Sequence, residues 1–180
     1  MNYFKFLKIA LSDYLVVGAL MPTGKYAIRR ILSQFKPGYR TVVEYGAGEG
    51  VITKEILKRL PADGKIIAIE LHPDLLVQLQ KIDDPRLDIW TGDVLELSKS
   101  LPKSDIIISG IPFSQISREK QETIIRQTAD ALNKGGVFVA YQNSLLLLKT
   151  LNKFFPKTRW LFEPRNIFPY FILISKKLDL

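Results

Sequence analysis

The sequence predicts an open α/β fold built around one mostly parallel sheet. Apolar, β-rich runs alternate with segments of helical periodicity between residues 41 and 154, and a glycine-rich turn joins the first run to the first of these helices. Two more β-rich runs, separated by a short turn, close the chain. Strands that alternate with helices pair in parallel, whereas two strands joined by a short turn pair antiparallel. We therefore expect seven strands, of which the last two form an antiparallel hairpin.

Length, charge and cysteine content narrow the class of protein. A chain of 180 residues suits one domain, and we expect residues 1–36 to cover a core formed by residues 37–180. The chain has no cysteine and one histidine, so we expect no disulfide, no metal centre and a reducing, cytoplasmic compartment. The net charge of +8 predicts attraction to phosphate-bearing partners, either nucleic acid or an anionic membrane surface.

Two amphipathic helices are predicted ahead of the sheet, over residues 2–20 and about 24–35. In the first helix an aromatic and aliphatic stripe that begins at Phe4 lies apart from Lys5 and Lys8. Such a helix either packs on the sheet or lies in a membrane interface. Its longest apolar run falls short of the roughly 20 residues that span a bilayer, and no signal-peptide cleavage site is evident.

The core elements follow in order, with β-branched and aromatic residues in the strands and glycine or proline at the turns between them. Strands are predicted near 41–46, 65–70, 87–91, 105–109 and 136–142, helices near 50–60, 73–81, 117–133 and 144–154, and the hairpin strands over Trp160–Glu163 and Ile167–Ser175.

The turn after the first predicted strand carries the strongest functional signal. Glu44 lies in the strand's last residues, and Gly46, Gly48 and Gly50 follow at alternate positions before a helical pattern begins. Backbone without side chains at such a turn lets a nucleotide-like ligand approach closely. The third glycine comes one residue earlier than in the G-x-G-x-x-G dinucleotide fingerprint. The alternative is a tight turn that binds nothing.

The pattern E-x-G-x-G-x-G resembles the first motif of class I S-adenosylmethionine-dependent methyltransferases. The resemblance implies a Rossmann-like fold with a seven-stranded mostly parallel sheet, a terminal antiparallel hairpin, an N-terminal helical cover, and S-adenosylmethionine as cofactor. In such a site Glu44 faces a cationic group of the cofactor or organises the turn. Glu70, at the end of the second strand, faces the ribose hydroxyls or is an ordinary surface acid.

A third acid, Asp93, ends the third predicted strand. It contacts the adenine amino group, with the Val94 N–H near a ring nitrogen, or it caps the following helix. The expected cofactor-binding residues are Glu44, Gly46, Ala47, Gly48, Gly50, Glu70, Leu71, Asp93, Val94 and Ser109.

The fourth predicted strand ends in Ser-Gly-Ile-Pro-Phe, where amino-methylating enzymes of this class often carry (Asn/Asp)-Pro-Pro-(Tyr/Phe). Ribosomal RNA adenine dimethylases carry Asn-(Leu/Ile)-Pro-(Tyr/Phe) there. Gly110 replaces the amide that would hold a base nitrogen, which weighs against adenine methylation. The carbonyls of Gly110 and Ile111 are candidate acceptors for an amine N–H, and the Phe113 ring is a candidate cation–π partner. The expected catalytic residues are Gly110, Ile111, Pro112 and Phe113, and no general base stands out.

Ser-Gly-Ile-Pro-Phe is also similar to the Ser-Gly-Leu-Pro segment of bacterial phospholipid N-methyltransferases. Residues 17–22 resemble that family's Val-Gly-Ala-(Ile/Val)-x-Pro pattern, and residues 165–171 resemble its late Arg-x-Asn stretch. The chain departs from that family at Thr23-Gly24, where the family usually has small hydroxyl residues, and at Phe168-Pro169-Tyr170, which is bulkier than its counterpart. The resemblance implies N-methylation of phosphatidylethanolamine and its methylated intermediates by a protein peripheral on the membrane. The rings of Tyr26, Tyr141 and Tyr170 are candidate cation–π partners of the headgroup. Arg165, whose Arg-Asn setting matches that family, is a candidate for the lipid phosphate.

Two alternatives stay open from the sequence. A relative of ribosomal RNA adenine N6-methyltransferases would use the basic charge for nucleic acid, and Ile-Pro-Phe supports it. A peripheral membrane protein with a vestigial cofactor site would bind lipid surfaces and no S-adenosylmethionine.

Overall fold

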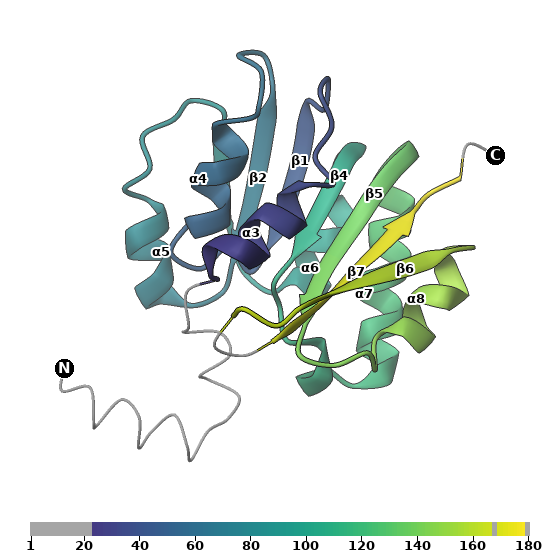
Figure 1. Ribbon diagram of the computed structural model, residues 1–180. Helices are drawn as coiled ribbons and strands as arrows, with labels where there is room; N and C mark the ends of the chain where they lie inside the picture. Colours follow the sequence, from purple (N-terminus) through teal and green to yellow (C-terminus); the bar gives the residue numbers. More distant parts are fainter. Residues whose placement is uncertain (1–22, 167–168, 179–180) are drawn as a thin grey trace, which may run out of the picture.

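The computed structural model describes residues 23–166 and 169–178, which fold around a seven-stranded sheet (Figure 1). The strands lie in the order β3-β2-β1-β4-β5-β7-β6. The first five pair in parallel, and β7 pairs antiparallel with both β5 and β6, as expected. The strands are β1 (Thr41–Tyr45), β2 (Lys65–Glu70), β3 (Leu87–Thr91), β4 (Ser104–Ser109), β5 (Leu132–Gln142), β6 (Thr158–Glu163) and β7 (Tyr170–Lys176).

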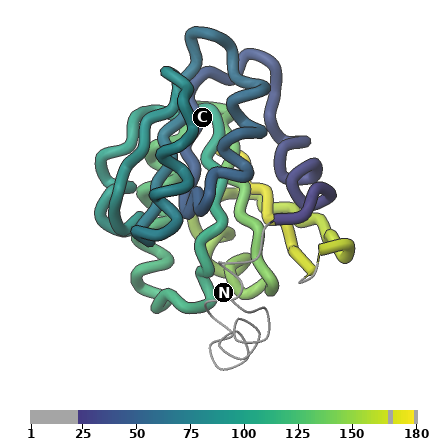
Figure 2. The backbone as a smooth tube through the Cα atoms, turned by 90° about the vertical axis from the view of Figure 1, so that its left-hand side faces the viewer, coloured from purple at the N-terminus to yellow at the C-terminus, as the bar shows by residue number. Residues whose placement is uncertain are grey.

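Helices cover both faces of this sheet, as the turned view in Figure 2 also shows. In Figure 1, α3, α4 and α5 lie in front of the sheet, and α6, α7 and α8 lie behind it. The α-helices are α3 (Lys25–Leu32), α4 (Val51–Leu57), α5 (Pro73–Leu79), α6 (Val94–Leu97), α7 (Arg118–Ala131) and α8 (Leu148–Phe154), with short 3-10 turns at Ser98–Ser100 and Phe113–Gln115.

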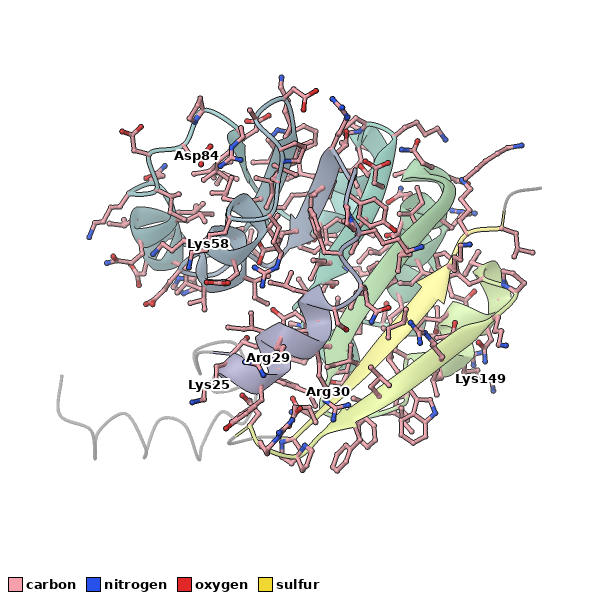
Figure 3. The ribbon with its side chains drawn as sticks, turned by 45° about the horizontal axis from the view of Figure 1, so that its top comes forward. Lys25, Arg29, Arg30, Lys58, Asp84 and Lys149 are labelled. Atoms are coloured by element: carbon pink, nitrogen blue, oxygen red, sulfur yellow. The ribbon has the colours of Figure 1, made fainter. Side chains whose placement is uncertain are left out.

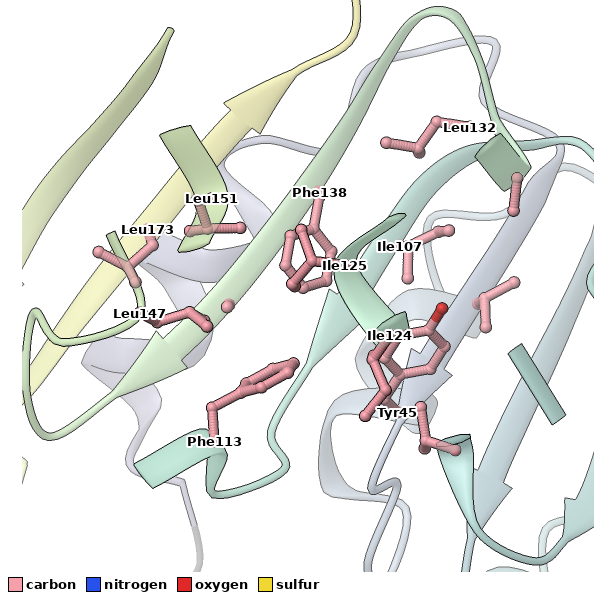
Figure 4. Close-up of a cluster of buried hydrophobic side chains, with 14 of the residues drawn as sticks. Tyr45, Ile107, Phe113, Ile124, Ile125, Leu132, Phe138, Leu147, Leu151 and Leu173 are labelled. Carbon is pink, nitrogen blue, oxygen red and sulfur yellow. The ribbon is translucent and has the colours of Figure 1, made fainter. Parts of the chain in front are cut away.

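The hydrophobic core lies in two layers because successive strand residues point to opposite faces. Ile107 and Phe138 pack under α7 and α8 together with Phe155 (Figure 4). Ile106 and Val139, one position away on the same strands, pack under α3 and α4. Because the central strands are buried on both faces, their sequences read as nearly continuous apolar runs.

The α3 helix ties the start of the described chain to the terminal hairpin. Its buried face carries Ala27 and Ile31, and Arg30 Nε donates to Glu163 Oε2 at 2.7 Å. Figures 1 and 2 both show α3 beside β6 and β7. This helix forms the part of the predicted helical cover that the structure describes; the predicted helix over 2–20 lies outside the described residues.

Most predicted elements are found, and the differences lie mainly at their ends. The fifth strand begins at Leu132 rather than 136, because the chain stays extended through an irregular pairing with β4 near Ser104. The helix predicted over 144–154 begins only at Leu148. The helix α6 was missed, since Val94–Leu97 is too short to show a helical period.

The order of the strands reverses between β1 and β4. From β1 the chain proceeds outward through β2 and β3 on one side, then returns to β4 and β5 on the other. Ligands of open α/β sheets bind outside the carboxyl ends of the strands at such a reversal. Gly46 follows β1 there and Gly110 follows β4, and the Gly110 N–H donates to the Tyr45 carbonyl at 2.9 Å.

Candidate active site

The glycine turn after β1 presents bare backbone at the strand reversal. Gly46, Gly48 and Gly50 have φ of 69°, 58° and 81°, a region that residues with a Cβ enter at a cost. A Cβ on Gly48 would meet no heavy atom within 4 Å, so this position faces open space. A Cβ on Gly46 would instead stand 3.0 Å from Cγ2 of Ile111, which follows β4. The turn therefore combines one open position with close packing against the loop after β4.

Glu70 at the end of β2 lies against this turn. Its Oε2 accepts from the Gly48 N–H at 2.7 Å, and its Oε1 accepts from the N–H groups of Leu71 and His72 at 2.9 and 2.8 Å. Glu70 is therefore not an ordinary surface acid, since it is buried and fixes the turn. Each carboxylate oxygen has two lone pairs, so Oε2 keeps acceptor capacity for a ribose hydroxyl. The ribose contact stays a prediction.

Glu44 organises the turn from inside the protein. The carboxyl is buried, and Thr53 Oγ1 in α4 donates to Glu44 Oε2 at 2.6 Å. Burial, and to a smaller degree the charge of Glu70, raises the pKa of Glu44 to about 8, although the Thr53 hydrogen bond acts in the opposite direction. A cation held nearby would favour the ionised carboxylate, so the protonation state of Glu44 is sensitive to what the crevice binds.

The adenine side of the predicted site is formed after β2 and β3. Asp93 caps α6, since its Oδ1 accepts from the Leu95 N–H at 2.8 Å, so the capping alternative is realised in the structure. The cap uses one carboxylate oxygen, and contact of the other with adenine stays a prediction. Val94 is the first residue of α6, where backbone N–H groups lie outside the helical ladder. The side chain of Leu71 is 64% exposed and offers an apolar surface for a flat base.

The loop after β4 is held by a residue that sequence reasoning missed. The Phe113 N–H donates to Gln142 Oε1 at 3.1 Å, and Gln142 Nε2 donates to the Ile111 carbonyl at 2.9 Å. Gln142 thus fixes the Ile-Pro-Phe segment from the end of β5. The sequence gives one indication of this role, since the apolar pattern of the strand ends in the polar residue Gln142. The Ile111 carbonyl, a predicted acceptor for the amine, already accepts this hydrogen bond.

The expected role of the Phe113 ring is not found. Phe113 is only 1% exposed and packs in the core layer under α7 and α8 (Figure 4). Phe113 is the first residue of a 3-10 turn and its ring packs into the core, so the ring does not face a headgroup in this structure. Pro112 precedes the turn and leads the chain into it. At the end of β4, Ser109 Oγ is buried and has no hydrogen-bond partner among the described atoms.

The four predicted headgroup residues lie in two contacting pairs. The rings of Tyr141 and Tyr170 meet edge to face, with centroids 5.4 Å apart. The Arg165 guanidinium lies 4.1 Å above the Tyr26 ring and makes two hydrogen bonds to the buried carboxylate of Glu163, at 2.7 and 2.8 Å. Arg165 is therefore already paired, and binding of a lipid phosphate through its remaining donors stays a prediction.

The strand order, the bare glycine turn and the acids at the ends of neighbouring strands define an α/β enzyme of the nucleoside-binding methyltransferase class. The chain belongs to the methyltransferase domain family, whose model matches residues 42–136. The match covers the glycine turn, Glu70 at the end of β2, Asp93 after β3, and the loop after β4. The protein is accordingly an S-adenosylmethionine-dependent methyltransferase.

Two relatives differ in how much of this chain they match. The chain is 27% identical over 177 residues to an ornithine lipid N-methyltransferase of Singulisphaera acidiphila, which covers 93% of this chain and 92% of that protein. It is 31% identical over 119 residues to a ribosomal RNA small subunit methyltransferase A of Mycoplasma mycoides, covering 62% of this chain and 43% of that protein. The chain spans less than half the length of the second relative.

Solved structures show the same fold. A precorrin-6y C5,15-methyltransferase of Geobacter metallireducens superposes with a TM-score of 0.72 at 19% identity, covering 88% of this chain and 91% of that one. A Thermus thermophilus 16S rRNA N2 G1207 methyltransferase, solved with S-adenosylmethionine and guanosine, superposes with a TM-score of 0.64 at 21% identity, covering 83% and 42%.

The residues around the glycine turn fit S-adenosylmethionine, which is the cofactor. The open space at Gly48 gives its nucleoside bare backbone to approach, and the exposed Leu71 offers an apolar contact for its base. The carboxylates of Glu44 and Glu70 suit its positive charges, and the unpaired hydroxyl of Ser109 is a buried polar atom in need of a partner.

Two features are absent from residues 23–166 and 169–178. No group of three or more histidine, cysteine, aspartate and glutamate side chains is arranged there to hold a metal ion. None of the helices in these ranges has both the length and the apolar character needed to cross a membrane.

Proposed function

We propose that this methyltransferase transfers methyl groups to the primary amine of a membrane lipid headgroup. Phosphatidylethanolamine and ornithine lipid share this chemistry, since each carries an alkyl amine on a short tether beside an anionic group. The observation that carries the proposal is the extent of similarity: a lipid N-methyltransferase matches this chain along almost its whole length, whereas the ribosomal RNA relative matches 62% of it.

The acceptor side of the site supports an alkyl amine. Position 110 is glycine, so the amide that would hold a nucleobase nitrogen is missing. In its place the structure brings Tyr141 and Tyr170 together beside the loop after β4. Aromatic faces attract ammonium groups and hold quaternary ones particularly well. Such a site suits an amine that gains methyl groups and keeps its positive charge.

The terminal hairpin gives the site an exposed aromatic surface, which we call the hairpin aromatic surface. It consists of Trp160, Phe162 and Phe171. Trp160 and Phe162 are 48% and 43% exposed, and both rings pack on Phe171, at centroid distances of 5.8 and 5.0 Å. Phe171 pairs with Gln142 of β5, so this surface begins beside the acceptor loop. Amphipathic aromatic side chains are favoured at the interface of a bilayer.

Basic residues surround the same end of the molecule. Figure 3 shows Lys25 and Arg29 on α3, which packs on the hairpin, and Lys149 on α8. Each basic residue near an anionic bilayer contributes about 1 kcal/mol of attraction. The predicted amphipathic helix over 2–20 would add to this contact, and its residues directly precede the described chain. We infer that the hairpin end of the sheet faces the membrane.

The residues of the crevice have separate tasks in the reaction. When bound, S-adenosylmethionine supplies a methyl group activated by its sulfonium. Gly48, Glu70 and Asp93 hold and orient the nucleoside. Gln142 fixes the loop after β4, so that its carbonyls keep one geometry relative to the acceptor amine. The amine attacks in its neutral form and releases its extra proton after methylation, and water at the open edge accepts this proton.

The proposal is tested by offering the purified protein labelled S-adenosylmethionine and three acceptors in parallel. The acceptors are vesicles of phosphatidylethanolamine in phosphatidylglycerol, vesicles of ornithine lipid in phosphatidylglycerol, and small-subunit ribosomal RNA. We expect label in at least one lipid, and the two lipid arms separate the two sources of amine. Label in RNA alone would overturn the proposal. Cofactor affinity measured by calorimetry would separate both outcomes from a protein that binds membranes without a working site.

A further inference from the structure

The phenol group of Tyr141 occupies the space that a side chain at position 110 would need. A Cβ built on Gly110 would stand 2.5 Å from Cζ of Tyr141 and closer still to its hydroxyl oxygen. Tyr141 comes from β5, beside β4 in the sheet, and lies on the same sheet face as Ile108 and Val139. No residue larger than glycine fits at position 110 while Tyr141 keeps this conformation. The two positions are therefore coupled.

The Tyr141 hydroxyl is held by the start of the described chain. It shares a hydrogen bond with Thr23, and the hydroxyl of Tyr170 is hydrogen-bonded to both Thr23 and Asn166. Asn166 Oδ1 also accepts the Gly24 N–H at 2.8 Å. These contacts join three distant parts of the sequence, and Thr23, which bonds to both tyrosines, fixes the position of the Tyr141 oxygen before any ligand binds.

The electrostatic surroundings keep this hydroxyl protonated. Burial, followed by the negative charges of Glu44 and Glu70, raises the pKa of Tyr141 well above its ordinary value. A neutral phenol is a poor general base, yet it has lone pairs that accept an N–H. A carboxylate nearby favours positive charge close to the hydroxyl, and Glu44 becomes one when it releases its proton. The position therefore suits an amine that becomes an ammonium.

We propose that the Tyr141 hydroxyl takes the place of the side chain that position 110 lacks, and that it positions the acceptor amine by accepting its N–H. This inference rests on the proposed function and names the residue that contacts the amine. An amide offers a coplanar donor and acceptor, which matches the edge of a nucleobase. A hydroxyl whose hydrogen rotates matches a tetrahedral amine, and the adjoining Tyr170 ring holds the charge that develops.

The first test removes one oxygen atom. Tyr141→Phe keeps the ring and loses the hydroxyl, and Tyr39→Phe is the matched control because the buried Tyr39 hydroxyl has no partner among the described atoms. We expect kcat/KM for the lipid amine to fall about 10- to 100-fold in Tyr141→Phe, which corresponds to one hydrogen bond to a charged group. Cofactor affinity should match that of Tyr39→Phe, whereas the melting temperature of Tyr141→Phe should be somewhat lower, because Thr23 loses its hydrogen-bond partner.

The second measurement does not depend on turnover. With the protein saturated by S-adenosylhomocysteine, calorimetry measures binding of glycerophosphoethanolamine and of Nα-acetylornithine, soluble fragments of the two headgroups. We expect about tenfold weaker binding of the preferred fragment to Tyr141→Phe than to Tyr39→Phe. Equal affinity and equal kcat/KM in the two variants would overturn the inference.

The third measurement tests the coupling of the two positions. Gly110→Asn alone should lower the melting temperature, because its side chain meets the Tyr141 ring. Adding Tyr141→Ala opens that space, so the double variant should recover at least half of the loss. Strictly additive losses would show that the two residues are not coupled.

The failure of this inference differs from the failure of the proposed function. A wild-type protein that methylates neither lipid overturns both. A wild-type protein that methylates a lipid, together with a Tyr141→Phe variant that methylates it equally well, overturns the inference alone.

Discussion

The carboxylate of Glu70 accepts a hydrogen bond from the N–H of Gly48, which lies 22 positions earlier in the chain, at an N···O distance of 2.7 Å. The end of β2 thereby holds the glycine turn of β1 in its left-handed geometry before a cofactor arrives. Preorganisation of this kind lowers the ordering cost of binding. Because Gly48 faces open space, the same turn leaves a place for the nucleoside.

A side chain at position 48 should block cofactor binding and spare the fold. Asparagine tolerates positive φ better than most residues, so Gly48→Asn places a side chain in the open space at modest strain. We expect the dissociation constant for S-adenosylmethionine, measured by calorimetry, to rise more than tenfold. Gly46 is a poorer site for this test, since a side chain there would push against Ile111.

Gly38→Asn is the matched control for this variant. Gly38 has φ of 92° and no heavy atom within 4 Å of a built Cβ, and it lies in the loop before β1, at the opposite end of that strand. Cofactor affinity should be unchanged in Gly38→Asn. Unchanged affinity in Gly48→Asn would instead mean that the nucleoside does not lie over this turn.

The buried carboxyl of Glu44 predicts a pH dependence of stability. Its pKa rises from 4.5 to about 8 in the folded protein, mainly through burial. The folded state therefore binds a proton that the unfolded state has lost, and stability falls as pH rises from about 4.5 to about 8. Glu44→Gln keeps an acceptor for Thr53 and cannot ionise. Its melting temperature should vary less across this range than that of the wild type.

Glu44 also links pH to cofactor affinity. Since a cationic cofactor favours the ionised carboxylate, binding releases the proton of Glu44 and strengthens as pH rises toward about 8. Calorimetry in buffers of different ionisation enthalpy measures this proton release. A wild-type protein that releases no more protons than Glu44→Gln would show that Glu44 does not sense the cofactor.

The Glu163 carboxylate predicts a second dependence, of opposite sign. Hydrogen bonds from Arg165 and Arg30 outweigh burial and lower the pKa of Glu163 from 4.5 to about 2. The unfolded state therefore binds the proton first, and this stabilisation is present above about pH 4.5 and lost as pH falls toward 2. Glu163→Gln should lower the urea midpoint at pH 7 and have a smaller effect at pH 3.

Glu96→Gln controls for the loss of an exposed charge. Glu96 pairs with Lys99 on the surface, with both side chains more than half exposed, and such pairs contribute little to stability. Its urea midpoint at pH 7 should equal that of the wild type. Equal midpoints for Glu163→Gln and Glu96→Gln would contradict the structural importance of the Arg30–Glu163–Arg165 contact.

The sequence predicts local features of this site well and spatial ones poorly. The glycine turn and Glu70 follow from the alternation of strands and helices, because the carboxyl ends of neighbouring parallel strands must meet. Gln142 makes two hydrogen bonds to the loop after β4, which we call the Gln142 clamp, and Tyr141 fills the space at position 110. Both features depend on β5 lying beside β4. No periodicity in the sequence reveals which side chain of one strand reaches the next. The Phe113 ring was mispredicted for the same reason, since its direction is set by the turn after β4.

The Gln142 clamp predicts linked losses of stability and activity. Gln142→Leu leaves the Phe113 N–H and the Ile111 carbonyl without this partner in a buried place, which costs about 1–3 kcal/mol per unsatisfied group. We expect a lower melting temperature and slower methyl transfer, because the loop after β4 loses its fixed position. Asn143→Ala, at an exposed neighbouring position, should change neither by a comparable amount. A Gln142→Leu protein of normal turnover would show that the clamp does not position the acceptor.

The hairpin aromatic surface predicts where the protein meets a bilayer. Replacing both Trp160 and Phe162 by serine removes two exposed rings without emptying the core, so melting temperature and cofactor affinity should change little. Cosedimentation with phosphatidylglycerol-rich vesicles should weaken at least tenfold, since two aromatic side chains each contribute on the order of 1–2 kcal/mol when they enter an interface.

Val77→Ser is the control, because Val77 is 54% exposed on α5 and lies outside this surface. If both proteins bind vesicles equally well, the membrane contact lies elsewhere, and the segment over 2–20 becomes its candidate. High salt should weaken the remaining binding further, because the lysines and arginines around the hairpin act through screened charge.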